Sequence, residues 1–391
     1  MRILQLCKKS PTPQRDGESV AIHQITKSFI LKGDEVHVLS MLTSKHPNFD
    51  ASSELNGASY TYVKIPTEES IIAAFKSIFT QDPYIVERFY HNDFLLALID
   101  KLNEQKYDVI LCEGVFLGLY LDTIRKYSQG KVVLRAHNVE HVIWERLVPE
   151  TKNWLKRVYL KRVMLPQFKH FEERFIKKVD AIVPISPIDE VYFSAFSKKP
   201  MLLIPAATDV FEVSVLPKVF SVGFIGGMDW QPNKEGVVWF LNEVWKPFVQ
   251  DDKDVQLSIA GRNFPEEMLN WEYPKVSFMG EVSDAKVFME QQSVIIAPIF
   301  SGSGMRVKII EAMSLGKCII SSPVGAEGIQ CENDKDILIA KEADQWIEAL
   351  DQLWQSPDKL TRLGTSAKEL AEREYSLSFY AEKLHVFLQN L

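Results

Sequence analysis

Residues 301–329, SGSGMRVKIIEAMSLGKCIISSPVGAEGI, contain a small-residue loop, a helical segment and an apolar strand in close succession. The apolar run Val294–Ile299 leads into the loop, Gly316 ends the helical segment, and Cys318–Ser322 forms the following strand. A loop that opens onto a helix offers backbone N–H groups and the positive end of the helix dipole to an anion. The stretch therefore predicts an α/β unit with a phosphate site at its loop.

The side chains of this stretch extend the prediction from phosphate to nucleotide sugar. Arg306 and Lys308 place positive charge beside the loop, and Glu311 follows within the helix. A carboxylate at that place accepts hydrogen bonds from ribose or sugar hydroxyls. Small residues alone fit an ordinary strand–loop–helix unit equally well, so the inference rests on the combination of loop, cations and acid.

The composition is that of a globular protein of two domains, since the chain has 391 residues. Its net charge of −7 argues against nucleic acid as a partner. The four cysteines form no CxxC pair, which predicts free thiols. No apolar run reaches the length of a membrane span, and Arg2–Cys7 reads as a strand rather than as part of a signal peptide. We therefore expect a cytoplasmic protein.

Short apolar runs alternate with helical segments, which predicts parallel sheets covered by helices. The expected strands of the first half are Arg2–Cys7, Glu35–Ser40, Val109–Glu113, Lys131–His137, Ala181–Ile185 and Met201–Pro205. Those of the second half are Ser221–Ile225, Val255–Ala260, Val276–Met279, Val294–Ile299, Cys318–Ser322 and Ile337–Ile339. Domain boundaries are expected at 1–208 for the first domain, 209–219 for a linker and 220–374 for the second domain.

Glycines and polar residues follow many of these strands, at the place where ligands bind in open α/β sheets. The residues in this position are Gly17, His137, Asn138, Gly226, Gly227, Gly261, Arg262, Glu281 and the loop 301–305. Two such domains facing each other enclose a cleft lined by these loops. The GxGxxG turn of dinucleotide dehydrogenases is missing after the first strand of either half, which argues against hydride transfer.

Over essentially its full length the chain resembles the retaining glycosyltransferases of family 4. The segments that carry the resemblance are GESVAIHQITKSFILKGDEVHVLS (17–40), RAHNVE (135–140), VGFIGGMDWQPNKEGVVWFL (222–241), IAGRNFP (259–265), VSFMGEVSD (276–284) and GSGMRVKIIEAMSLGKCIISSPVGAEGI (302–329). The resemblance implies the GT-B fold, two Rossmann-like, doubly wound parallel-sheet domains that face each other across a cleft. It assigns the acceptor to the first domain, the nucleotide sugar to the second, and a helix over 375–391 that crosses back to the first.

The resemblance also implies roles for single residues. Relatives have two glutamates with seven residues between them, of which the second, at Glu311, binds the ribose; the first is replaced here by Ser303. Relatives have an arginine and a lysine that grip the diphosphate; here Met228 stands in place of the arginine and Lys234 keeps the lysine. The donor-binding set expected in this way is Gly17, Gly226, Gly227, Arg262, Glu281, Ser303, Gly304, Met305, Arg306, Val307 and Lys308.

His137 belongs to a His-Asn-x-Glu motif that the resemblance places at the cleft edge, near the donor sugar and the acceptor. The residue by itself fits a buried histidine that ends a strand equally well. We expect His137, Lys234 and Glu311 to act in catalysis, with positive groups stabilising the leaving diphosphate. The donor is expected to be a UDP- or GDP-linked sugar, and the absence of a DxD acid pair predicts that no metal or other cofactor is required.

Residues 144–178 carry ten Lys or Arg against four Glu in an otherwise acidic chain. Trp154, Leu155, Val158, Tyr159, Val163 and Met164 interleave with Lys156, Arg157, Lys161 and Arg162. An apolar face bordered by cations can lie on an anionic membrane, so we expect peripheral contact with the inner face of the cytoplasmic membrane. A long solvated helix with one face on the domain core remains the alternative.

The sequence thus predicts a retaining glycosyltransferase that moves a sugar from a nucleoside diphosphate to a hydroxyl of a glycan or lipid-linked acceptor. Two other functions stay open at this point. One is a nucleotide-sugar epimerase of the same fold, although no surplus of acids marks the strand ends. The other is an inactive sugar-nucleotide-binding regulator, which the departures at Ser303 and Met228 would fit.

Overall fold

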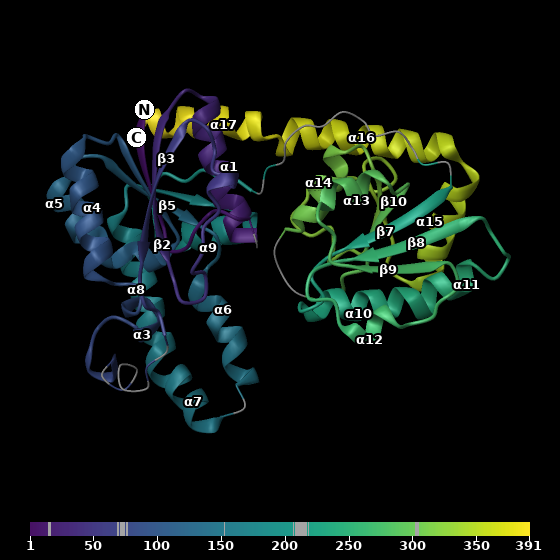
Figure 1. The fold of residues 1–391 in the computed structure, drawn as a ribbon, viewed down its shortest axis with the longest axis horizontal. Helices are drawn as coiled ribbons and strands as arrows, with labels where there is room; N and C mark the ends of the chain where they lie inside the picture. Colours follow the sequence, from purple (N-terminus) through teal and green to yellow (C-terminus); the bar gives the residue numbers. More distant parts are fainter. Residues whose placement is uncertain are drawn as a thin grey trace. The chain divides into compact units, whose positions relative to one another are not determined.

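The computed structural model describes residues 1–14, 17–68, 70, 75, 77–151, 153–205, 207, 217, 219–301 and 305–391 (Figure 1). The chain forms two compact units. Unit 1 contains Met1–Pro205 and Tyr380–Leu391, and unit 2 contains Ala206–Phe379. Apart from Pro217 and Val219, the expected linker 209–219 lies outside the described residues.

Unit 1 is built on a parallel sheet with the strand order β3-β2-β1-β4-β5-β6. Its strands are β1 (Arg2–Cys7), β2 (Glu35–Leu42), β3 (Ala58–Lys64), β4 (Val109–Glu113), β5 (Lys131–Ala136) and β6 (Ala181–Pro184). This is the order of a Rossmann sheet, in which the direction of winding reverses between the first and fourth strands. Central strands are buried on both faces, which explains why they read as continuous apolar runs.

Two strand predictions in unit 1 are wrong. Met201–Pro205 is not a strand: it makes one bridge, from Met201 to Ile182, because Pro184 of β6 has no N–H to continue the ladder. The prediction also missed β3, whose residues ASYTYVK are mostly half-buried at the sheet edge. A half-exposed edge strand lacks the apolar run by which the central strands are found.

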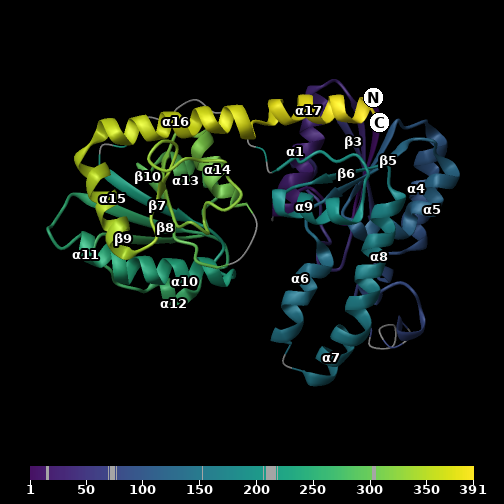
Figure 2. The ribbon, with the colours of Figure 1, turned by 180° about the vertical axis from the view of Figure 1, so that it is seen from behind.

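Helices cover both faces of this sheet, with α1 on one side and α4 and α5 on the other in both views (Figure 2). The helices of unit 1 are α1 (Gly17–Leu31), α3 (Tyr84–Glu87), α4 (Asn92–Glu104), α5 (Leu121–Tyr127), α6 (Glu140–Leu147), α7 (Trp154–Tyr159), α8 (Leu165–Lys178) and α9 (Pro187–Phe196). Short turns are η1 (Ala51–Ser53), η2 (Ser77–Phe79), η3 (Val115–Tyr120), η4 (Val148–Glu150) and the π-helical η5 (Leu160–Met164). Gly33, at φ 73°, ends α1 as its sequence predicts.

The last helix, α17 (Leu377–Gln389), joins unit 1 through buried charge. His385 Nδ1 lies 2.9 Å from Asp34 Oδ2, and the amino group of Met1 lies 2.7 Å from Asp34 Oδ1. The first residue and the last helix therefore contact the same aspartate, which directly precedes β2. Figure 1 shows the two ends of the chain close together.

Unit 2 repeats the same topology, with the order β12-β11-β10-β7-β8-β9. Its strands are β7 (Phe220–Ile225), β8 (Val255–Ala260), β9 (Val276–Gly280), β10 (Val294–Ala297), β11 (Cys318–Ser321) and β12 (Leu338–Ile339). Its helical segments are α10 (Gln231–Trp239), η6 (Phe240–Trp245), α11 (Lys246–Phe248), α12 (Glu266–Leu269), α13 (Ala285–Glu290), α14 (Val307–Ser314), α15 (Ala343–Gln355) and α16 (Pro357–Tyr375). Gly316, at φ 69°, follows α14 and ends it as predicted. Within the described ranges, no helix combines the length and the apolar character needed to cross a membrane.

Candidate functional site

In unit 2 the strand order reverses between β7 and β10, which pair with each other in parallel. Ligands of open α/β sheets bind outside the carboxyl ends of the strands at such a reversal. Gly226 and Gly227 follow β7, and Met305 and Arg306 lie between β10 and α14. The topology thus brings two of the loops for which the sequence predicts donor contacts to one edge of the sheet.

Close backbone contacts explain the glycines at this edge. Gly226 N donates to the Ala260 carbonyl at 3.0 Å, and Met228 N donates to the Arg262 carbonyl at 2.9 Å. A Cβ on Gly261 would lie 1.8 Å from the Gly226 carbonyl oxygen. The loops after β7 and β8 therefore support each other, and their glycines are needed for this packing whatever ligand they bind.

Lys308 lies beneath the loop that follows β7. Its Nζ donates to the Ile225 carbonyl and to Asn233 Oδ1, both at 3.1 Å, and Asn233 Nδ2 donates to the Gly227 carbonyl at 2.8 Å. Burial, with a smaller contribution from Arg306, lowers the pKa of the Lys308 amine to about 7. In the structure Lys308 thus holds the loop in place, a role that the sequence did not indicate.

Arg306 is the last residue before α14 and is largely buried. Its guanidinium lies over the Trp230 ring, 4.9 Å from the ring centre, so side chains from the loops after β7 and β10 are in contact. Burial lowers the pKa of Arg306, and Glu327 opposes this shift. The contact places one cation between the two loops at the strand reversal.

Glu311 lies on α14, one turn after the helix begins. Among the described residues its carboxyl has no hydrogen-bond or ion-pair partner, and burial alone raises its pKa. A desolvated acid without a partner is unfavourable for the folded protein unless a ligand or water supplies hydrogen bonds. This is the arrangement expected of a group that receives ligand hydroxyls.

Lys234, near the start of α10, forms an ion pair with Glu267 of α12, with Nζ 3.2 Å from Oε1. The lysine side chain is about one-third exposed. It is therefore a surface cation with a partner inside unit 2, and binding a diphosphate would require it to share or exchange that partner.

The other expected donor contacts are more scattered. Arg262 and Glu281 are exposed, and Glu281 follows β9, the outermost strand of the sheet. Val307 begins α14 beside Met305, whereas Gly17 begins α1 in unit 1. Ser303 and Gly304 lie outside the described residues.

His137 directly follows β5 in unit 1 and is only 5% exposed. Its Nε2 lies 2.8 Å from Oε2 of Glu113, the fully buried last residue of β4. Gln5 Nε2 donates to the other oxygen of Glu113 at 2.7 Å, and the Thr26 hydroxyl donates to Gln5 Oε1 at 2.7 Å. The His137 Nδ1 atom is buried and has no hydrogen-bond partner among the described residues. His137 is thus buried, and one of its nitrogens makes no hydrogen bond to any residue that the structure describes.

Sequence reasoning missed Glu113 and Gln5. The signal was present, because each is a polar residue among apolar neighbours in a strand, Glu113 in VILCE and Gln5 in RILQLC. A polar residue buried within such a strand needs a hydrogen-bond partner. What the sequence cannot tell is that the two partners would be each other and His137.

Other charged groups surround His137. Glu18 forms ion pairs with Lys8 at 3.3 Å and Lys9 at 2.9 Å. Burial opposes the charged form of Glu18, but Lys8, His137 and Lys9 together lower its pKa to about 2. Burial raises the pKa of Glu140. These residues follow β1 and β5, so unit 1 also has a polar site at its strand ends. In the part of the chain that the structure describes, no cluster of three or more His, Cys, Asp or Glu could hold a metal ion.

The basic stretch 144–178 contains α7, whose side chains are mostly exposed, and α8, which packs on the core of unit 1. On α7, Trp154, Leu155 and Val158 are 65%, 60% and 51% exposed, and the four neighbouring cations are exposed as well. In contrast, Met164 is buried, and Tyr159 is half-buried with its hydroxyl 2.9 Å from Ser77 Oγ. Met164 and Tyr159 therefore do not belong to the outward apolar face that the sequence predicted.

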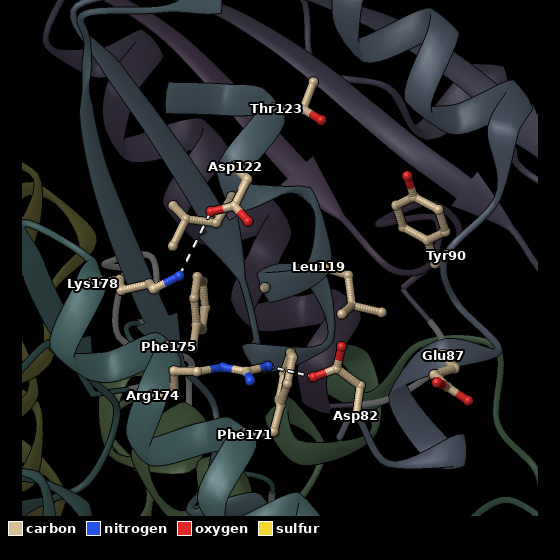
Figure 3. A pocket seen from close by; sticks show the side chains of 12 residues that line it. Asp82, Glu87, Tyr90, Leu119, Asp122, Thr123, Phe171, Arg174, Phe175 and Lys178 are labelled. Carbon is tan, nitrogen blue, oxygen red and sulfur yellow. Dashed lines mark hydrogen bonds and ion pairs between the residues drawn. The ribbon is translucent and has the colours of Figure 1, made fainter. Parts of the chain in front are cut away.

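Within this basic stretch, α8 lines a cavity of about 660 Å³ between α3, α5 and α8 (Figure 3). Arg174 forms an ion pair with Asp82 across it, and Lys178 Nζ lies 3.6 Å from Asp122 Oδ1. Phe171 of α8 is buried in the core of unit 1. α8 has one face on the core, and two of its cations, Arg174 and Lys178, are paired within unit 1. It therefore fits the alternative of a solvated helix with one face on the domain core.

Comparisons with known proteins bear on both units. Residues 219–356 match the family model described as "Glycosyl transferases group 1". A protein of Klebsiella pneumoniae described as "Uncharacterized 44.6 kDa protein in cps region" is 25% identical over 254 residues, which span 62% of this chain and 64% of that protein. The match therefore covers less than two thirds of the relative.

Solved structures resemble the whole chain at low identity. Sucrose-phosphate synthase from Thermosynechococcus elongatus has a TM-score of 0.69 at 18% identity, covering 100% of this chain and 99% of that one. Anabaena Alr3699/HepE, solved with UDP-glucose, has 0.64 at 12% identity and covers 100% of both chains. A mutant of S. aureus TarM, solved with Fondaparinux, alpha-GlcNAc-glycerol and UDP, has 0.66 at 11% identity, covering 99% of this chain and 100% of that one.

These likenesses confirm the fold expected from the sequence, two parallel six-stranded sheets with the GT-B topology. The family match covers the loops that contain Gly226, Arg262 and Arg306, and the helix that contains Glu311. Together the two findings support the expectation of a glycosyltransferase enzyme.

Proposed function

We propose that the chain is a retaining glycosyltransferase of the family 4 type that transfers a sugar from a nucleoside diphosphate to a hydroxyl group. The observation that carries the proposal is Glu311, an acid without a partner among the described residues, just over one helical turn from Arg306 at the strand reversal of unit 2. Both lie in the segment that matches the glycosyltransferase model. Glu311 would accept hydrogen bonds from the ribose hydroxyls, while Arg306 supplies positive charge near the diphosphate.

In the proposed reaction the bond between the anomeric carbon and the diphosphate oxygen breaks, and the acceptor oxygen forms a bond to the same face of that carbon. The acceptor proton passes to the leaving phosphate oxygen. No intermediate is attached to the protein, so the chain contributes by placing charge where the leaving group develops it. Lys234, Arg306 and the backbone amides at the start of α14 are the groups for that task.

A UDP-linked donor is the first choice for testing, because Alr3699/HepE and TarM were solved with UDP or UDP-glucose. A GDP-linked sugar is the second. We propose a glycan or lipid-linked acceptor in surface polysaccharide synthesis, since the Klebsiella relative is described as a protein of a cps region.

We further propose that the protein works at the inner face of the cytoplasmic membrane. The α7 surface, defined as the exposed apolar residues and cations of α7 and η5, supports this contact. It consists of Trp154, Leu155, Lys156, Arg157, Val158, Lys161 and Arg162. Exposed apolar side chains among cations are the composition that binds anionic lipid surfaces.

The test is a panel of UDP- and GDP-linked sugars, assayed for release of the nucleoside diphosphate. The proposal expects release from one of them through transfer or slow hydrolysis. Conversion of the sugar without release would identify an epimerase instead. Tight binding without turnover of any donor would identify a regulator, and either result would replace the proposal.

A further inference from the structure

A chain of buried hydrogen bonds in unit 1 ends at one nitrogen of His137. It runs from the Thr26 hydroxyl to Gln5, from Gln5 to Glu113 and from Glu113 to His137, with distances of 2.7, 2.7 and 2.8 Å. All four side chains are buried, and they come from α1, β1, β4 and the residue after β5. The bonds from Glu113 link residues that lie 108 and 24 positions apart in the sequence.

The chemistry of the partners determines the tautomer of the imidazole. A carboxylate only accepts hydrogen bonds, so Gln5 must turn its NH₂ toward Glu113, and His137 must carry its proton on Nε2. Arg135 Nε lies 3.9 Å from the Glu113 oxygen that contacts His137. In a neutral imidazole with the proton on Nε2, Nδ1 has a free lone pair.

A second histidine in the same unit shows the contrast. His141, at the start of α6, uses both nitrogens: Nδ1 contacts Glu172, and Nε2 lies 2.9 Å from the Tyr192 hydroxyl. His137 has a carboxylate on one side and no described partner on the other. A buried lone pair without a partner raises the free energy of the folded protein, and a ligand group that donates a hydrogen bond to it would remove this cost.

We propose that Glu113 is a positioning residue, which holds His137 in the Nε2–H tautomer so that Nδ1 accepts a hydrogen bond from a substrate hydroxyl. The inference rests on the proposed function for its substrate, a sugar hydroxyl of the donor or of the acceptor. Glu113 touches no substrate itself and acts through the imidazole. Glu18 and Glu140 interact electrostatically with the same ring and would favour a hydroxyl donor over an anion beside it.

The tautomer is measured by ¹⁵N spectra of histidine-labelled protein, with the His137 signal assigned from a His137→Gln variant. The chain has eight histidines, which keeps such spectra simple. In the parent we expect the Nε2–H form of neutral His137. Glu113→Gln puts an amide there, which can present either oxygen or NH₂ to the ring, so the Nδ1–H form should appear. The matched variant Glu172→Gln removes the carboxylate from His141 and should leave the His137 signal unchanged.

Activity tests the second half of the proposal, with UDP-glucose or whichever donor of the panel the parent uses. Glu113→Gln should slow turnover on the order of 10²-fold, with the nucleotide Kd close to the parent. The melting temperature should fall, because the buried Arg135 loses its nearby carboxylate. Loss of both hydrolysis and transfer to octyl glucoside would assign the hydroxyl to the donor; loss of transfer alone would assign it to the acceptor.

Three results would overturn the inference. A parent His137 in the Nδ1–H form, or one protonated on both nitrogens at the pH of the assay, would do so even if the variant fails to fold. A variant that keeps a single Nε2–H form would show that Glu113 does not set the tautomer. A changed tautomer with unchanged turnover would show that Nδ1 is not used. The spectra need no substrate, so a parent that turns over no donor would count against the proposed function and not against the role of Glu113 in the tautomer.

Discussion

Replacing Glu311 by Gln should weaken nucleotide binding and at the same time stabilise the free protein. The substitution keeps the shape of the side chain and removes its charge. In the structure the carboxyl is partly buried, has no partner among the described residues, and has a pKa raised by burial alone. Its charge therefore opposes folding, and in the proposed function a bound ligand makes use of it.

The loss of affinity follows from the hydrogen bonds that a ribose would make. Hydrogen bonds to a charged acceptor contribute more than neutral ones, so we expect Glu311→Gln to cost about 1–3 kcal/mol of binding free energy. This corresponds to a Kd about 5- to 150-fold higher. Isothermal titration calorimetry with UDP and GDP measures the Kd of parent and variant. The control is Glu348→Gln, which removes a charge at an exposed position on α15, elsewhere in unit 2.

The gain in stability depends on pH in a direction that the structure determines. Because the pKa of Glu311 is raised in the fold, the native protein holds a proton that the unfolded chain has already released at the same pH. The stability of the parent therefore falls as pH rises through that window, and Glu311→Gln lacks this fall. Melting temperatures of parent and variant should be close below the ordinary pKa of glutamate, and the variant should melt higher at pH 7.

Unchanged nucleotide affinity would remove Glu311 from the binding site. A variant that melts lower than the parent at neutral pH would refute the reasoning in another way, because it would mean that the carboxylate has a stabilising partner within the protein.

Three further predictions concern the cations. Lys234→Ala should lower turnover without a matching loss of stability, since its ion pair with Glu267 is partly exposed. The control Glu267→Gln keeps the lysine and should turn over at least as fast as the parent. Equal rates for all three proteins would exclude Lys234 from catalysis. Burial lowers the pKa of Lys308 to about 7, so the stability of the parent should rise with pH from there toward the ordinary pKa of lysine. Lys308→Met, followed by chemical denaturation, should show a smaller rise, to which Lys317 still contributes. A parallel pH dependence of the two proteins would mean that the Lys308 amine is not buried in solution. Replacing the four cations of the α7 surface by Gln should abolish sedimentation with anionic vesicles at low salt. Transfer to a soluble acceptor should continue in this variant. Equal sedimentation of parent and variant would exclude this surface as a membrane contact.

Much of the fold can be predicted from local sequence. The central strands are apolar runs of the length that parallel sheets bury, and Gly33 and Gly316 end their helices by adopting positive φ. The loop after β10 and the glycines after β7 were identified because small residues at strand ends are a local pattern. The edge strand β3 was missed, because an edge strand with half-buried side chains has no comparable local signal.

The sequence by itself determined the alternation of strands and helices, the glycine turns and the residue types offered at the strand ends, because these depend on neighbours along the chain. Only the tertiary structure decided which of those residues meet. It placed Lys308 under a loop, left Glu311 without a partner among the described residues, turned α8 inward and α7 outward, and joined Glu113 to His137. Desolvation and hydrogen bonding between strands depend on residues far apart in sequence, and the chemistry of a buried group is set by those distant neighbours rather than by its own identity.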